Sequence, residues 1–143
     1  MRIPSPPGSW PRWSALVLDG FVAVTAIGGG AALATGAEGT RFPVDWLRRT
    51  PWTSYLIPGL ILACVVGGSA VGAWIAVVRR RPSAGAATSV AAVLLAGQIL
   101  GEVILLAQPG PITPTEVFYL VVAAGMLLSG VLLHVGRQPQ SST

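Results

Sequence analysis

Two ionisable side chains, Asp19 and Glu102, and the amide of Gln98 lie inside long apolar stretches of this 143-residue chain, where ionisable groups are costly and usually serve a purpose. Gln98 and Glu102 are four residues apart, so a helix places them on one face. Such a pair can bind a proton or a cation, or it can form a polar clamp between helices, for example with an arginine of the first loop. Asp19 stands alone in an earlier stretch. It is either a further member of the candidate intramembrane polar site or a structural charge that Arg12 or the arginines at 79–81 neutralise near the surface.

Asp19 and Glu102 are expected in opposite halves of the membrane, about 15 Å apart along its normal at 1.5 Å per residue. This separation excludes a paired acid–base site, so no catalytic residue is predicted. No metal or cofactor is predicted either, because the only histidine, His134, offers too few ligands for zinc or haem. The single cysteine, Cys64, cannot form an internal disulfide.

The elements that hold these residues follow from composition. Hydrophobic residues make up 52% of the chain and charged residues only 10%, against roughly 25% charged in a soluble domain. Four apolar stretches approach the ~20 residues needed to cross a bilayer, and lipid requires them to be helical. The first stretch, of about 22 residues, is too long for a signal-peptide core and is expected to be a retained helix.

The sequence therefore predicts an all-α, four-helix transmembrane bundle in a single domain, residues 1–143. The predicted spans are residues 14–35, 58–78, 84–107 and 115–135. They are joined by an outer loop (36–57), an inner loop (79–83) and a second outer loop (108–114), and flanked by tails at 1–13 and 136–143.

Helix starts are marked by proline. Thr113 and Glu116 flank Pro114 in the pattern of a capping box, which predicts the start of the last helix. The pair at 50–51, Thr-Pro, predicts a short interfacial helical turn over residues 51–57, followed by a bend and a spanning helix from about Pro58.

Arginine distribution predicts the orientation. All nine basic residues are arginine, and six of them fall on the two tails and the inner loop. The positive-inside rule then puts both termini in the cytoplasm. An arginine-only, Ala- and Gly-rich composition is typical of a high-GC bacterium, which predicts a multi-pass protein of the bacterial cytoplasmic (inner) membrane. No continuous basic stripe exists, so no nucleic-acid partner is expected. The six are Arg2, Arg12, Arg79, Arg80, Arg81 and Arg137.

The first outer loop contains an amphipathic segment, residues 44–49, that is expected to lie on the lipid headgroups. Its hydrophobic residues would dip inward while its arginines meet phosphates. The segment is either a membrane anchor or a surface that holds a headgroup. The candidate headgroup site consists of Trp46, Arg48, Arg49, Trp52 and Tyr55.

Two GxxxG patterns predict close helix contacts, because glycine lets backbones approach. They are Gly68 with Gly72, and Gly97 with Gly101. Either pattern can serve packing within the bundle or an interface between subunits. Gly97 and Gly101 directly precede the polar pair, so the glycine seam and the polar face should be adjacent.

The string Thr50-Pro51-Trp52-x-x-Tyr55-x-x-Pro58-Gly59-Leu60 resembles one found in small, uncharacterised bacterial (actinobacterial-like) four-helix integral membrane proteins, where a "TP-[FW]-x-x-Y-x-x-PGL" motif leads into the second helix. The resemblance implies topology and no activity.

Three functions remain open at this stage. The first is a structural, accessory or oligomeric interaction protein, since catalytic content is poor. The second is a small proton- or cation-coupled transporter or channel that uses Glu102. The third is a membrane enzyme or a lipid- or quinone-binding protein. The expected partners are membrane lipids, with a homo-oligomer or a larger membrane complex as a further possibility.

Overall fold

The computed structural model describes residues 9–106 and 109–137. Within these ranges it is all-helical, and four helices are long and apolar enough to cross a membrane. The chain is thus a multi-pass membrane protein of the predicted class. Arg2, Ala107 and the tail beyond Arg137 lie outside the described residues. The elements are α1 (Ser9–Thr35), η1 (Gly39–Arg41), η2 (Val44–Arg49), α2 (Leu56–Leu60), η3 (Ile61–Gly67), α3 (Gly68–Val78), α4 (Ala84–Leu105) and α5 (Pro114–Val135).

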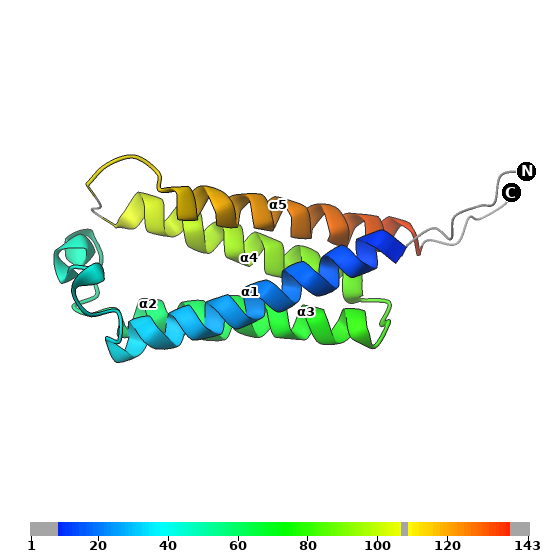
Figure 1. The fold of residues 1–143 in the computed structure, drawn as a ribbon, viewed down its shortest axis with the longest axis horizontal. Coiled ribbons are helices and arrows are strands. Elements are labelled where there is room, and N and C mark those ends of the chain that lie inside the picture. Colours follow the sequence, from blue (N-terminus) through cyan, green and yellow to red (C-terminus); the bar gives the residue numbers. More distant parts are fainter. Residues whose placement is uncertain (1–8, 107–108, 138–143) are drawn as a thin grey trace, which may run out of the picture.

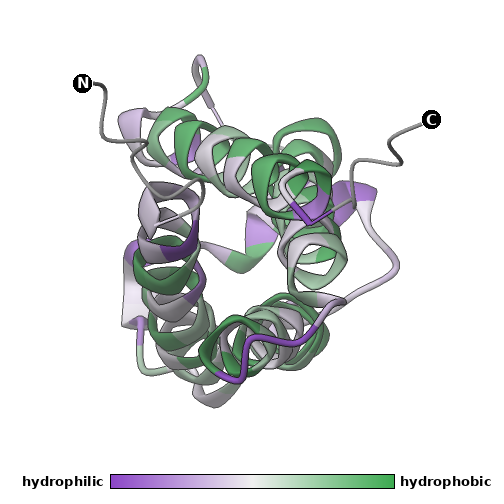
Figure 2. Ribbon diagram, turned by 90° about the vertical axis from the view of Figure 1, so that its right-hand side faces the viewer, coloured by the Kyte–Doolittle hydropathy of each residue, from purple (hydrophilic) through white to green (hydrophobic). Residues whose placement is uncertain are grey.

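The four spans run alternately up and down the bundle, so that α1 begins and α5 ends at the same end (Figure 1). The second span is built from α2, η3 and α3 in succession. Viewed along the bundle, the spans stand at the corners of a square (Figure 2). Each packs on its two neighbours: α1 on the second span and on α5, and α4 on α3 and on α5.

The interior is rich in alanine and glycine, with a few larger side chains such as Leu95 and Met126, and many large apolar side chains cover the outside. Ala15, Ala70 and Ala91 are fully buried, whereas Val24 and Ile104 are 74% and 71% exposed. A water-soluble bundle would reverse this arrangement, because large exposed apolar surfaces are unfavourable in water. In lipid, by contrast, helices associate through close packing of small residues.

Pairs of glycines from different helices make the closest contacts. A Cβ atom on Gly59 would lie 2.6 Å from the carbonyl oxygen of Gly30, where α2 crosses α1. A Cβ atom on Gly85 would lie 2.6 Å from the carbonyl oxygen of Gly130, where α4 crosses α5. Backbone therefore packs directly on backbone at both crossings, which only glycine permits.

The prediction that the GxxxG patterns pack the bundle is wrong. A Cβ atom placed on Gly68, Gly72, Gly97 or Gly101 would meet nothing within 4 Å. The motif spacing marks one face of one helix, but a contact also needs a partner at that face, and the single chain supplies none. An interface between subunits at these glycines stays a prediction.

The predicted capping box of α5 is confirmed. The backbone N–H of Thr113 donates to Glu116 Oε2 (2.6 Å), and that of Glu116 donates to Thr113 Oγ1 (3.4 Å). The first helix begins at Ser9, five residues before the predicted start. Pro11 lies in its first turn, where a missing N–H costs no helical bond.

The predicted helical turn over residues 51–57 is wrong. Residues 51–55 are not helical, and the helical turns of the loop lie earlier, in η1 and η2. The hydroxyl of Thr50 donates back to the carbonyl of Leu47 (2.8 Å), so Thr50 ends η2 instead of starting a helix at Pro51. Pro58 falls in the first turn of α2 and breaks no helical bond. The π-helix η3 that follows was not predicted.

Candidate functional site

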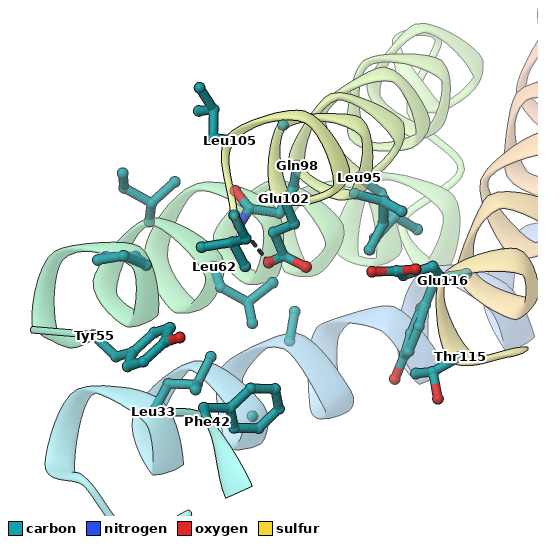
Figure 3. Close-up of a pocket in the computed structure, with 18 of the residues that line it drawn as sticks. Leu33, Phe42, Tyr55, Leu62, Leu95, Gln98, Glu102, Leu105, Thr115 and Glu116 are labelled. Atoms are coloured by element: carbon teal, nitrogen blue, oxygen red, sulfur yellow. Dashed lines mark hydrogen bonds between the residues drawn. The ribbon is translucent and has the colours of Figure 1, made fainter. Parts of the chain in front are cut away.

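A cavity of about 510 Å³ lies at the end of the bundle opposite to the start of α1. Its walls come from the second half of α1, from α2 and η3, from the end of α4 and from the start of α5. The first loop completes the lining. Figure 3 shows leucines from three of these walls, including Leu33, Leu62 and Leu95, around a few polar groups.

Glu102 is the central polar group, and its carboxylate points into the cavity (Figure 3). Its Oε1 atom accepts a hydrogen bond from Gln98 Nε2 at 2.8 Å, so the predicted pairing across one helical turn is confirmed. The predicted clamp to an arginine of the first loop is not formed. Arg41 lines the same cavity, but its guanidinium lies 3.7 Å from Glu38, which is the ion pair found in the described part of the chain.

Glu116 is a second carboxylate directed into the same cavity (Figure 3). The sequence identified it only as the helix cap of α5. Since α4 ends and α5 begins at the same end of the bundle, Glu116 comes to face Glu102 across the cavity. The sequence did contain a signal for this placement of Glu116. A short loop joins two antiparallel spans, so a residue at the start of the last span must lie level with a residue at the end of the span before it.

Aromatic residues of the first loop form the remaining wall. Phe42 has its ring centroid 6.2 Å from that of Trp46 and 6.0 Å from that of Tyr55. The Tyr55 hydroxyl donates to the carbonyl of Pro43 at 3.0 Å and so ties the end of the loop to the residue that precedes η2. Burial raises the pKa of the Tyr55 phenol, and the negative charge of Glu102 raises it further. The phenol is therefore a permanent hydrogen-bond donor at neutral pH.

Parts of the two sites predicted separately from the sequence share one cavity. Trp46, Trp52 and Tyr55 of the outer-loop set line it together with Glu102 and Gln98. Gly97 and Gly101 also line it, and their missing side chains leave space beside the polar pair. The predicted adjacency of the glycine seam and the polar face is thus confirmed.

Arg48 and Arg49 are not part of this cavity. Both side chains are exposed on η2 and do not line the cavity. The preceding residue, Leu47, is only 1% exposed, and its burial fixes η2 to the bundle. The amphipathic segment predicted at residues 44–49 exists as this short 3-10 helix.

Asp19 belongs to a different region. It is fully buried, and its Oδ2 atom accepts a hydrogen bond from Thr88 Oγ1 at 2.8 Å. The prediction that an arginine neutralises Asp19 is wrong for the described residues. Asp19 forms no ion pair among them, and both Asp19 Oδ1 and Arg12 Nε are buried without a hydrogen-bond partner in this part of the chain. Thr88 precedes Glu102 by fourteen residues of α4, about 21 Å at 1.5 Å per residue. The two acids are therefore far apart, as the sequence indicated.

No group of three or more metal-ligating side chains occurs in the part of the chain that the structure describes. The fold and the cavity define a four-helix membrane protein with an aromatic and acidic cavity at one end. Comparison of the chain with protein-family models, with curated proteins and with solved structures gives no match.

Proposed function

We propose that this protein binds a small amphipathic molecule in the cavity beside Glu102. The observation that carries the proposal is the cavity itself. Its volume of about 510 Å³ falls within the ~300–1,000 Å³ typical of small-molecule sites, which are apolar with a few converging polar groups. Glu102, Gln98 and Glu116 supply those polar groups here.

The position of Glu102 supports a binding role over a structural one. A carboxylate within a membrane span is costly and is usually retained for a pathway or a ligand. If Glu102 served only to clamp helices, it would bridge to another helix. Its hydrogen-bond partner is instead Gln98 of its own helix, and its carboxylate is directed into the open space.

We further propose that the protein lies in the bacterial cytoplasmic membrane with both termini inside and the cavity toward the outer side. Five arginines gather at the end where α1 begins, and they are Arg12, Arg79, Arg80, Arg81 and Arg137. Arg137 donates hydrogen bonds to the backbone carbonyls of Arg80 (3.2 Å) and Arg81, which joins the end of α5 to the inner loop. The opposite end carries three arginines and two acids in its first loop, as the positive-inside rule requires.

Binding is tested with a variant in which a new side chain fills the cavity. The substitution is made at a glycine where an added side chain meets no neighbouring atom. A Cβ atom on Gly101 meets nothing within 4 Å, so Gly101→Leu should fold normally while it occupies the cavity. Gly28→Leu is the matched control, since Gly28 is equally open but does not line the cavity. Binding of two probes, phenyltrimethylammonium and its uncharged isostere tert-butylbenzene, is measured by equilibrium dialysis against the protein in lipid nanodiscs.

Saturable binding of at least one probe is expected for the native protein and for Gly28→Leu. Gly101→Leu should lose it by on the order of tenfold or more, because a filled pocket excludes the ligand. If neither probe binds above the Gly101→Leu level, the proposed function is wrong.

A second candidate, a subunit that assembles with copies of itself, is favoured by one observation. Gly68 and Gly72 present an open, exposed glycine face on α3, which is suited to close helix contact. Gly72→Leu should then reduce the oligomer to monomer in a light-scattering measurement. A monomeric native protein would exclude this candidate.

A further inference from the structure

We infer that the ligand of this cavity is an organic cation, an amine or quaternary ammonium group that carries an apolar substituent. This inference rests on the proposed function, since it specifies the ligand of the same cavity. Three independent features support it: the charge of the lining, the aromatic wall and the apolar walls beside the acids.

The lining is acidic. Among the residues that the structure describes, the lining contains three carboxylates, Glu38, Glu102 and Glu116, and one cationic side chain, Arg41. Arg41 forms an ion pair with Glu38. The carboxylates of Glu102 and Glu116, which accept hydrogen bonds from Gln98 and from the backbone of Thr113, are directed at the same space and add negative charge to it. In surroundings of low dielectric constant, opposite charges attract strongly and like charges repel strongly. A cationic ligand is therefore favoured and an anionic one is excluded.

The aromatic wall suits the same ligand. The rings of Phe42, Trp46 and Tyr55 are neighbours on the first loop and line the cavity. A cation attracts the negative face of such rings, and groups of aromatic side chains are the usual means of holding quaternary ammonium ions. A headgroup placed beside Glu102 would thus meet a carboxylate on one side and aromatic rings on another.

The apolar walls specify the rest of the molecule. Leu33 of α1, Leu62 of η3 and Leu95 of α4 line the cavity around the acids. They offer hydrocarbon contact and no hydrogen-bonding side chain, which fits an alkyl or aryl substituent. A bare metal ion would need several converging ligand atoms, and the described chain has no group of three metal-ligating side chains.

The test uses the two probes of identical shape, which differ by one charge. The native protein should prefer phenyltrimethylammonium over tert-butylbenzene by on the order of tenfold, because a single charge pair at an effective dielectric constant of about 20 exceeds that difference. Glu102→Gln keeps the size and the hydrogen bond of this residue. It should weaken binding of the cation by about tenfold and leave binding of the neutral probe unchanged.

Glu116→Gln provides an independent second variant. Glutamine at this position preserves the capping box, so α5 should keep its start while the charge is lost. Asp45→Asn is the control, because Asp45 is an exposed acid of the same loop outside the cavity. Thermal unfolding midpoints equal to that of the native protein establish that each variant is folded.

The outcomes separate the two proposals. A cation preference that is lost in both glutamine variants and kept in Asp45→Asn supports the inference. Equal binding of the two probes, abolished by Gly101→Leu, overturns it and identifies a site for an uncharged molecule, such as a quinone or a lipid chain. If neither probe binds above the Gly101→Leu level, the proposed function itself is overturned.

Discussion

Asp19 and Glu102 each accept a hydrogen bond from a neutral side chain: Asp19 from a threonine and Glu102 from a glutamine. Neither pair brings a counter-charge, so each carboxylate depends on its surroundings for stabilisation. The surroundings differ. Asp19 is fully enclosed and belongs to the core of the bundle. Glu102 borders open space and is available to a ligand.

The closeness of Tyr55 to Glu102 gives a prediction at the level of single residues. Burial and the charge of Glu102 both raise the pKa of the Tyr55 phenol. Glu102→Gln removes the charge and leaves the burial, so the pKa of Tyr55 should fall but stay above its ordinary value of 10.0. The chain has two tyrosines, so a Tyr119→Phe background isolates the ultraviolet titration of Tyr55. An unchanged midpoint would contradict the arrangement of loop and helix described here.

Site residues differ in how far the sequence could identify them. The spacing of Gln98 and Glu102 was enough to predict their pairing, because helical periodicity decides it. The joining of this pair to Trp46, Trp52 and Tyr55 was not predictable. It depends on the loop folding back over the bundle, which the hydrogen bond between Tyr55 and Pro43 and the burial of Leu47 bring about.

At the level of elements, the presence of four long apolar helices followed from the four apolar runs, and the start of α5 followed from its capping box. The start of α1 at Ser9 did not follow from its apolar run. Helix contacts did not follow. A motif such as GxxxG describes one helix, whereas a contact needs complementary positions on two. The glycines that pack on each other, at positions 30, 59, 85 and 130, lie on different helices and share no spacing rule within one helix.

The crossing of α4 and α5 leads to a stability prediction. The Cβ atom of Gly85→Ala would lie 2.6 Å from the Gly130 oxygen and 2.7 Å from the His134 nitrogen, both backbone atoms that cannot move aside singly. Overpacking of this kind costs about 1–3 kcal/mol, which should lower the thermal unfolding midpoint in detergent. Gly28→Ala, with open space around its Cβ atom, should unfold at or above the native midpoint because alanine favours helix. Equal midpoints for the two variants would refute the close crossing.

For the molecule as a whole, the distribution of arginines gives a topology that can be measured. In a Cys64→Ala background, which removes the exposed native cysteine, a cysteine is introduced at Asp45 or at Ser83. Both positions are exposed, and they lie at opposite ends of the bundle. A membrane-impermeant maleimide should label Asp45→Cys in intact cells and Ser83→Cys only after permeabilisation. The reverse pattern would place the cavity on the cytoplasmic side.

The π-helical stretch Ile61–Gly67 in the second span has a consequence for how the gene can change. A π-helix holds one residue more per hydrogen-bonded ring than an α-helix does. Deleting a single codon in this stretch would let it revert to α-helical winding while both flanking helices keep their faces. The same deletion in α4 would rotate everything after it by about 100°, given 3.6 residues per turn, and carry Glu102 away from the cavity. A one-residue deletion should therefore be tolerated in the second span, within η3, and not in the third span, α4.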